Sequence, residues 1–194
     1  DTTMEQLRMI HKMNQIPTYS LADGFSLRLY QPGDEVVWTE ICKFGLLTEE
    51  EGIECWDKYM LAMENLLPER DVFFICDGSG KAVATCTGFV QPGGVGLLHM
   101  LGAKPEARGH RLGYSMTAYA LNKLVKELPD GNHMVRLKSD DWRLSAVKAY
   151  LQCGFQPVLF DVDMDTRWKA ICDKLDIHGV EMLDDHGNPT GVIL

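Results

Sequence analysis

The sequence predicts an α/β domain built around a mixed β-sheet. Three consecutive apolar segments, 72–76, 81–90 and 95–103, are separated by the glycine-bearing turns 77–80 and 91–94, a pattern typical of an antiparallel meander. Helical and strand patterns alternate after this meander. The expected order is therefore strand, two helices, three strands, helix, strand, helix, strand.

The N-terminal part contains one helical and one strand pattern. Leu7, Ile10 and Met13 recur at helical spacing, so residues 5–16 are predicted to form a short amphipathic helix. Residues 25–30 alternate apolar and polar side chains, which predicts a strand.

Two helices are expected between this strand and the meander. Asp34 ends a Gln-Pro-Gly-Asp turn and suits the cap of a helix that runs to about Phe44. A second helix is predicted over residues 50–66, with Pro68 as its stop signal.

The later elements are strongly periodic. Apolar residues recur every fourth position in segment 112–128 and predict a long helix with one buried stripe. Residues 134–138 are predicted to form a strand, 144–152 a helix and 155–160 a further strand. Gly154 suits the position directly after the helix, where a left-handed backbone ends it.

Composition restricts the class of protein. With 194 residues, 45% of them hydrophobic, the chain can fold around a sizeable core. It has no membrane-spanning apolar run and no secretory pattern, and its net charge of −9 disfavours nucleic acid and anionic membranes as partners. The six cysteines form no C-x-x-C pair, so we expect buried thiols in a cytoplasmic protein.

A glycine-bearing turn before the long helix is a candidate anion site. The stretch 105–116 reads PEARGHRLGYSM, and Gly109 and Gly113 would let a ligand approach its backbone closely. N–H groups at a helix start have no partner within the helix and face the positive end of its dipole, which stabilises an anion. The turn matches neither a P-loop nor a Rossmann fingerprint, and alone it is also compatible with a structural role.

A second motif lies one helix and one strand downstream. Tyr150-Leu-Gln-Cys-Gly-Phe155 ends a predicted helix, and Arg108-Gly-His-Arg-Leu-Gly113 forms the glycine turn. With the element order, these motifs make residues 25–165 resemble the GNAT superfamily of acyl-CoA-dependent N-acetyltransferases. The resemblance implies a mixed, mostly antiparallel central sheet flanked by helices and splayed between the fourth and fifth strands, here about 97–103 and 134–138.

The resemblance also implies one acetyltransferase domain over residues 1–194, in which 1–24 and 166–194 extend the core. Two residues depart from the family pattern. Arg111 stands where the first motif glycine is usual, and Arg143 stands where an asparagine often opens the later helix.

Acetyl-CoA is the cosubstrate that the resemblance implies. Its pantetheine would pair with the strand backbone near Leu101 and Ala103, and its pyrophosphate would lie on the N–H groups of the glycine turn. The residues of that turn are Arg108, Gly109, His110, Arg111, Leu112 and Gly113. No metal is expected, because the aspartates of segment 161–165 lack the glycine and glutamate of an EF-hand and suit a solvated strand face.

The implied reaction is direct attack of a neutral primary amine on the thioester in a ternary complex. Tyr150 occupies the position that protonates the leaving thiolate, since a phenol with a pKa of about 10 is protonated at neutral pH. A purely structural role for its ring stays open. His99 is a candidate base because histidine accepts a proton near neutral pH. The alternatives are a structural role for this histidine, a water chain as the proton acceptor, and the acidic residues at 49–54 and 140–141.

The acceptor site of such folds lies between the first helices and the late strands. The aromatic residues there, each a pocket wall or a core anchor, are Trp38, Phe44, Trp56, Tyr59 and Trp168. The expected partner is a small-molecule amine or a peptide amine, and homodimerisation is left open. The alternative to an enzyme is a catalytically silent acyl-CoA-binding sensor or interaction module.

Overall fold

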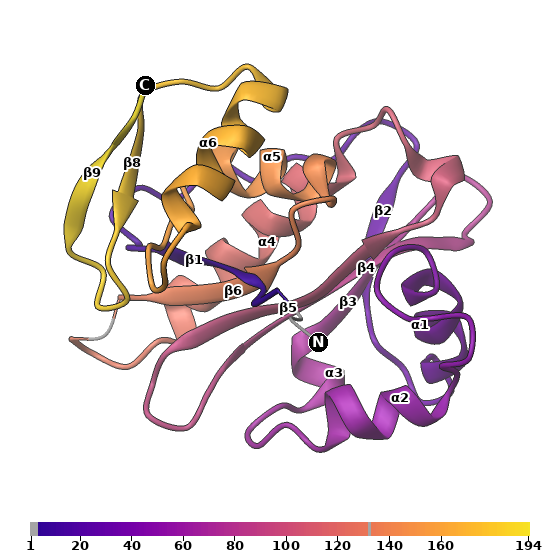
Figure 1. Ribbon diagram of the computed structural model, residues 1–194. Helices are drawn as coiled ribbons and strands as arrows, with labels where there is room; N and C mark the ends of the chain where they lie inside the picture. The colour runs from indigo at the N-terminus through magenta and orange to yellow at the C-terminus, as the bar shows by residue number, and fades with distance from the viewer. Residues whose placement is uncertain (1–3, 132) are drawn as a thin grey trace.

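A computed structural model describes residues 4–131 and 133–194. Its main sheet has seven strands in the order β2-β3-β4-β5-β6-β1-β7, and β8 and β9 form a separate hairpin (Figure 1). The strands are β1 (Leu7–His11), β2 (Ser26–Leu29), β3 (Val72–Cys76), β4 (Ala82–Val90), β5 (Gly96–Ala103), β6 (Val135–Ser139), β7 (Gln156–Pro157), β8 (Val180–Leu183) and β9 (Pro189–Ile193).

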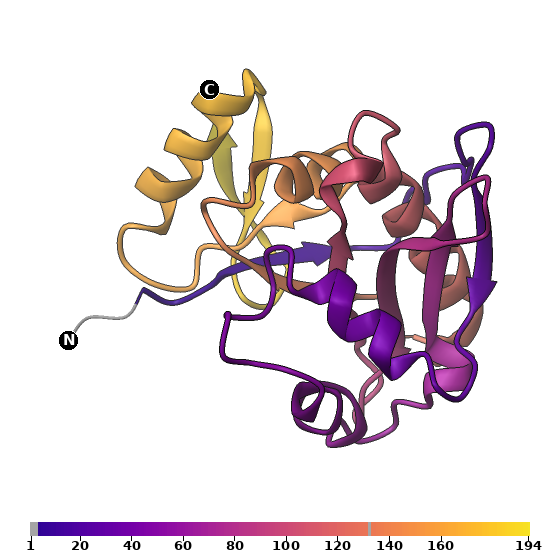
Figure 2. The same ribbon diagram turned by 90° about the vertical axis from the view of Figure 1, so that its right-hand side faces the viewer.

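Helices cover both faces of this sheet. One hydrophobic cluster joins the sheet to α4, α5 and α6, and a second joins the other face to α1 and α2. Figure 2 shows α6 and the yellow hairpin at the upper left, away from the indigo α1. The helices are α1 (Glu35–Cys42), α2 (Glu54–Trp56), the π-helical turn η1 (Asp57–Leu61), α3 (Pro68–Asp71), the 3₁₀ turn η2 (Pro105–Ala107), α4 (Leu112–Glu127), α5 (Leu144–Gln152) and α6 (Met164–Leu175).

The sheet is antiparallel except where β5 meets β6. These two strands run parallel and pair only at Gly96 with Val135 and at Leu97 with Arg136. Beyond Leu97, β5 continues to Ala103 without pairing to β6, so the sheet splays there. The predicted mixed, mostly antiparallel and splayed sheet is confirmed. The strands expected as the fourth and fifth are numbered β5 and β6 in the structure, because the unpredicted strand β1 comes before them.

A β-bulge lies on β5 at the start of the splay. Thr85 pairs with Gly102 and Thr87 with His99, which leaves Met100 and Leu101 opposite a single residue of β4. Met100 adopts a positive φ of 53°. A bulge bends its strand and re-aims the side chains around it, so it sets the direction of Leu101 next to the opening.

The predicted helix over residues 5–16 is wrong, since Leu7–His11 form β1. This strand lies between β6 and β7. Leu7 and Met9 join the cluster beneath α4, whereas Ile10 belongs to a separate cluster. The apolar spacing reflects two buried faces of an interior strand and not one face of a helix.

The region predicted as one helix over residues 50–66 contains only short helical turns, Glu54–Trp56 and Asp57–Leu61. Gly52 weakens a continuous helix, because glycine costs roughly 1 kcal/mol relative to alanine in a helix interior. Pro68 does not stop a helix but begins α3, where its missing N–H would have no helical partner.

The strand predicted over residues 155–160 is reduced to Gln156–Pro157. The N–H of Val158 still donates to the carbonyl of Arg8 on β1 at 3.0 Å, and the chain then follows the C-terminal hairpin, where the N–H of Leu159 donates to the carbonyl of Leu183 at 2.8 Å. Pairing with β8, in a parallel bridge between Val158 and Leu183, thus replaces pairing with β1 and ends the strand early.

The aspartates of segment 161–165 are not on a strand. They surround the start of α6, and Asp163 precedes that helix with a φ of 64°. Their side chains are exposed, as expected. Residues 166–194 are packed against the core, because Trp168 and Cys172 of α6 are buried in the main cluster.

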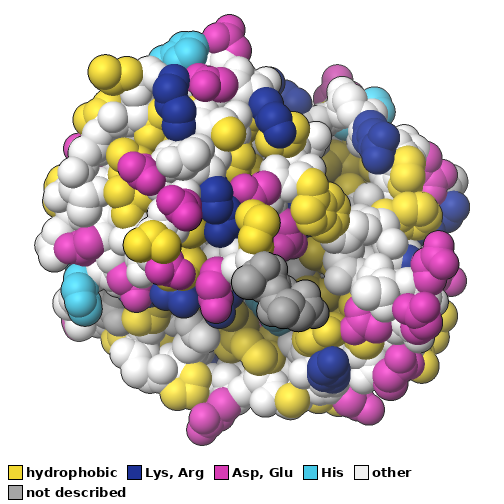
Figure 3. Space-filling view, in the orientation of Figure 1, with side chains coloured by type: hydrophobic (Ala, Val, Ile, Leu, Met, Phe, Trp, Pro, Cys, Tyr) yellow, Lys and Arg dark blue, Asp and Glu magenta, His cyan; other side chains and the backbone are white. Residues whose placement is uncertain are grey.

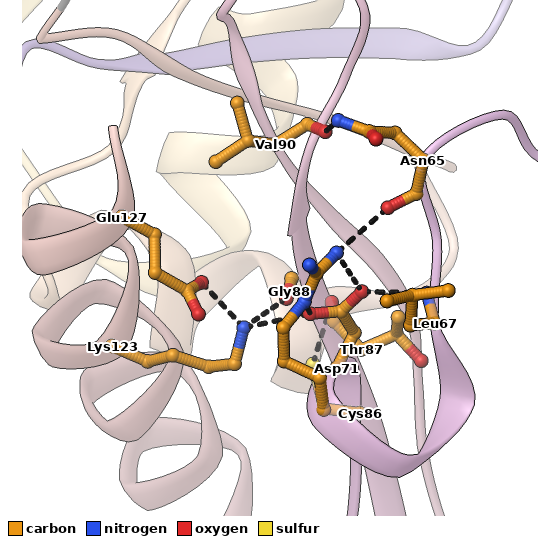
Figure 4. A network of polar contacts seen from close by, with 10 residues as sticks. Asn65, Leu67, Asp71, Cys86, Thr87, Gly88, Val90, Lys123 and Glu127 are labelled. Atoms are coloured by element: carbon orange, nitrogen blue, oxygen red, sulfur yellow. Dashed lines mark hydrogen bonds and ion pairs between the residues drawn. The ribbon is translucent and has the colours of Figure 1, made fainter. Parts of the chain in front are cut away.

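A buried polar network joins α3, β4 and α4 (Figure 4). The ammonium of Lys123 lies 3.0 Å from a carboxylate oxygen of Asp71 and donates to the carbonyl of Gly88 at 2.9 Å. Asp71 also accepts from the side chain of Arg70 and from the N–H of Leu67. The network therefore anchors α4 to the beginning of β3.

None of the helices within residues 4–131 and 133–194 is both long and apolar enough to cross a lipid bilayer.

Candidate acyl-CoA site

A cavity of about 950 Å³ opens at the splay of the sheet. Its walls are the end of β5, the turn into α4, the start of α5 and the loop after α1. The face drawn in Figure 3 is hollowed to the right of its centre, and hydrophobic side chains gather along this hollow. The cavity therefore lies where β5 has unpaired backbone and α4 begins.

The turn into α4 presents backbone N–H groups to this cavity. Leu112, Gly113 and Tyr114 form the first turn of the helix, where N–H groups have no intrahelical partner. Gly109 has a φ of 86° and open space where a Cβ would lie. The turn therefore places backbone donors beside the cavity, at the positive end of a sixteen-residue helix.

The cavity is strongly basic although the chain is acidic. Five basic side chains line it, and none of the described residues that line it is Asp or Glu. They are Lys104, Arg108, Arg111, Arg143 and Lys148. In a protein of net charge −9, this concentration of positive charge indicates a site for an anion.

Most of the predicted cofactor residues meet in this cavity. Those that line it are Leu101, Ala103, Arg108, Gly109, Arg111, Leu112 and Gly113. His110 is not among the described lining residues; its ring packs instead against Phe25 with the centroids 4.8 Å apart. The turn thus directs one side chain towards β2 while its neighbours face the cavity.

Arg111 adopts a left-handed backbone with a φ of 54° directly before α4. This conformation accommodates a Cβ only with strain, which explains why glycine would suit the position. The guanidinium of Arg111 lies 4.4 Å from the centre of the Tyr114 ring. Arg111 therefore adopts the left-handed backbone that a glycine would adopt at this position, and its side chain adds a positive charge to the turn.

Arg143 reaches across the splay from the start of α5. Its Nη2 donates to the carbonyl of Leu101 at 2.7 Å, so the side chain bridges the two diverging halves of the sheet. Trp142, directly before it, is 65% exposed and lies at the cavity together with Phe44. The sequence did not predict Trp142 and Lys148 as site residues; for Trp142 the available signal was a tryptophan directly after the polar turn 139–141.

Tyr150 lies on α5 but is not among the described residues that line the cavity. It is 2% exposed, and its ring meets Phe155 edge-on with the centroids 6.0 Å apart. Burial raises the pKa of Tyr150, and the positive charge of Arg143 partly offsets this rise. The phenol is therefore protonated at neutral pH and has a guanidinium beside it.

His99 lies on β5, two residues before Leu101. Its Nε2 donates to the carbonyl of Tyr59 at 2.8 Å, which leaves Nδ1 without the proton in the neutral ring. Burial lowers the pKa of His99, and the bond to Tyr59 opposes this change. Neither His99 nor Tyr150 is among the described residues that line the cavity.

Among the aromatic residues considered for the acceptor site, Trp38, Trp56 and Trp168 are buried core anchors. Tyr59 donates its hydroxyl to the carboxylate of Glu51 at 2.8 Å. Phe44 alone of these aromatic residues lines the cavity. The described residues contain no cluster of three or more His, Cys, Asp or Glu side chains that could hold a metal ion.

The sequence profile described as "Acetyltransferase (GNAT) family" matches residues 37–155, more than half of the chain. The chain belongs to the GNAT acetyltransferase family. The profile extends from α1 through the glycine turn to Phe155, so it contains every wall of the basic cavity.

Curated relatives are mycothiol acetyltransferases. The chain is 31% identical to the one from Sanguibacter keddieii over 164 residues, which cover 76% of this chain and 49% of that protein. It is 27% identical to the one from Arthrobacter sp. (strain FB24) over 173 residues, or 85% of this chain and 50% of that protein. The chain spans about half the length of these relatives.

Solved structures share the GNAT fold. A GCN5-related N-acetyltransferase from Sphaerobacter thermophilus aligns with a TM-score of 0.58 at 19% identity, over 79% of this chain and 49% of that one. A GNAT-family acetyltransferase from Colwellia psychrerythraea has the same TM-score at 12% identity, over 80% of this chain and 54% of that one. At these identities the likeness concerns the fold.

Proposed function

We propose that this GNAT protein transfers an acetyl group from acetyl-CoA to the primary amine of a small molecule. The observation that carries the proposal is the charge of the cavity: five basic and no acidic side chains among its described lining residues, at the start of α4, in a chain of net charge −9. Coenzyme A carries its phosphates at one end, and the donors of the α4 turn suit a diphosphate.

The rest of the cofactor would extend along β5. Leu101 and Ala103 line the cavity beyond the last pair with β6, so their backbone groups suit hydrogen bonds to pantetheine. The carbonyl of Leu101 now accepts from Arg143. The guanidinium would have to share this acceptor with the pantetheine or release it.

Two side chains beside the splay fit the chemistry. Tyr150 is a protonated phenol that would donate to the departing thiolate. His99 is held neutral and has a free acceptor nitrogen, which suits removal of a proton from the attacking amine, directly or through water. Both assignments require the substrates to reach side chains that are not among the described lining residues of the cavity.

A small-molecule acceptor is favoured by the curated relatives, whose names specify mycothiol as the compound concerned. The loop after α1 and Trp142 at the cavity are the surfaces on which such an amine would lie.

Calorimetry with acetyl-CoA tests the binding step. Arg108→Ala and Lys148→Ala each remove one cavity charge and are expected to weaken binding roughly tenfold, about 1.4 kcal/mol. Lys126→Ala, an exposed residue near the other end of α4, is the matched control and should bind as the wild type does. Equal affinity of all four proteins would overturn the placement of the phosphates.

Release of free thiol from acetyl-CoA against a panel of amines tests the reaction. Turnover with at least one small amine is expected. Tight acetyl-CoA binding without turnover on any amine would favour a catalytically silent acyl-CoA-binding module.

A further inference from the structure

Arg143 is a cation at the reaction end of the cavity, separate from the basic residues of the α4 turn. It precedes α5 and contacts the carbonyl of Leu101 on β5, whereas Arg108 and Arg111 belong to the turn itself. Under the function proposed above, the phosphates of coenzyme A lie on that turn. Pantetheine and the thioester are neutral, so the cofactor offers no charge to match Arg143.

The protein offers no carboxylate to Arg143 either. Among the described residues, no Asp or Glu forms an ion pair with it, and no acidic side chain lines the cavity. Asp140 and Asp141 lie closest in sequence, but the side chain of Asp140 faces Gln6 and that of Asp141 is bonded to Arg167. Both neighbouring acids are therefore engaged away from the guanidinium.

Three groups near Arg143 are neutral. Cys42, Cys86 and Tyr150 are close enough to sense its charge. Burial raises the pKa of each, that of Cys86 to about 12, so all three stay protonated near neutral pH. Taking a cation partly out of water without a counter-ion is costly, which makes the site receptive to an anion.

Arginine is well suited to one class of anion. Its planar guanidinium has five N–H donors; one bonds the carbonyl of Leu101, and the side chain of Tyr150 lies beside the guanidinium. The other donors match the two oxygens of a carboxylate. The bond to Leu101 holds the guanidinium across the splay, where acyl group and amine would meet.

We propose that Arg143 binds a carboxylate carried by one of the two substrates, on the acyl group or on the amine. The proposal rests on the proposed function for its orientation of the cofactor. It assigns a specificity role to the residue that replaces the asparagine often found here in the family.

Two kinetic comparisons distinguish the two sources of the carboxylate. The first compares succinyl-CoA with the neutral butyryl-CoA as donors to one amine. The second compares an amino acid with the amine that lacks its carboxylate, such as phenylalanine with phenethylamine, using acetyl-CoA. We expect the carboxylate-bearing member of one pair to have at least tenfold higher kcat/KM in the wild type.

Substitution at position 143 should remove this preference. Arg143→Gln keeps a polar N–H donor but lacks the charge, and is expected to equalise the pair. Arg143→Lys should restore part of the difference. Lys126→Gln, which removes a charge outside the cavity, should keep the full preference. Absence of a preference in both wild-type pairs, or an unchanged preference in Arg143→Gln, would overturn the proposal.

A binding measurement separates failure of this inference from failure of the proposed function. Free succinate should bind the wild type at least tenfold more tightly than Arg143→Gln in calorimetry, without any cofactor. If acetyl-CoA binds and acetylates a neutral amine while succinate does not distinguish the two proteins, the carboxylate site is wrong and the proposed function stands. If succinate binding depends on Arg143 and acetyl-CoA is not bound, the proposed function fails.

Discussion

The ammonium of Lys123 on α4 lies 3.0 Å from Oδ1 of Asp71, whose side chain is completely buried at the start of β3. The pair is supported by the carbonyl of Gly88 and the guanidinium of Arg70. A buried ion with such partners is tolerated only as a complete network, because removal of one partner leaves an uncompensated charge.

Replacement of Lys123 by Met should therefore destabilise the protein strongly. We expect the free energy of unfolding in urea to fall by about 3–5 kcal/mol, since Asp71 would lose a buried counter-ion. Lys126→Met on the exposed face of α4 is the control, with an expected change within about 0.5 kcal/mol. A loss below about 1 kcal/mol in Lys123→Met would show that Arg70 alone satisfies the carboxylate.

The buried His11 should make stability depend on pH. Its Nε2 donates to the carbonyl of Cys153 at 2.9 Å, and its Nδ1 accepts the N–H of Met13. Burial lowers its pKa from the ordinary value of 6.5, against the opposing effect of the bond to Cys153. Protonation would also break the bond from Met13.

The direction of this pH dependence follows from the protons that His11 binds in the unfolded and folded states. Below pH 6.5 the unfolded chain binds a proton at His11 while the folded protein resists it. The free energy of unfolding is thus highest above that pH and falls as the pH drops through it, by at most about 1.4 kcal/mol per pH unit for one histidine. His99, whose pKa burial also lowers, contributes with the same sign.

Urea unfolding between about pH 7.5 and 5.5 measures this dependence. His11→Gln should show a shallower slope than the wild type, whereas the exposed His186→Gln should keep the wild-type slope. A slope unchanged by His11→Gln would mean that other groups control stability in this range.

Glycine should be better tolerated than alanine at position 111. Arg111 has a left-handed backbone, which costs an L-residue with a Cβ roughly 1–2 kcal/mol. Arg111→Gly and Arg111→Ala both lose the contact with the Tyr114 ring, so their difference isolates the backbone. We expect the glycine variant to be more stable by about 1 kcal/mol in chemical denaturation. Alanine at least as stable as glycine would show that the turn relaxes to another conformation.

Tyr150→Phe should lower kcat more than it weakens acetyl-CoA binding. Phenylalanine preserves the packing of a side chain that is 2% exposed, so only the hydroxyl is lost. A proton donor contributes about 10²–10⁴-fold to a rate, and we expect a fall near the lower end if water replaces it. Steady-state kinetics combined with calorimetry separates rate from affinity. Tyr119→Phe, whose ring packs on Phe73, is the control. Weaker binding with an intact kcat would refute the donor role.

Local patterns predicted the elements whose hydrogen bonds are local. The stripe of α4, the helix 144–152 and its terminating Gly154 are all present, with Gly154 at a φ of 99°. The meander of β3, β4 and β5 was predictable because tight turns join its strands. The N-terminal strand β1 was not predictable, since the two strands that pair with it, β6 and β7, are more than a hundred positions away in the sequence.

The sequence by itself determined the family, the central helix and the glycine turn, because these depend on spacing within short segments. Only the tertiary structure showed that seven predicted cofactor residues share one basic cavity, that His110 packs on Phe25 instead, and that Arg143 reaches Leu101 across the splay. Such contacts depend on how strands diverge and on where neighbouring acids find other partners. Interactions between distant parts of the chain determine the divergence of the strands and the partners of these acids, and no local sequence pattern predicts such interactions.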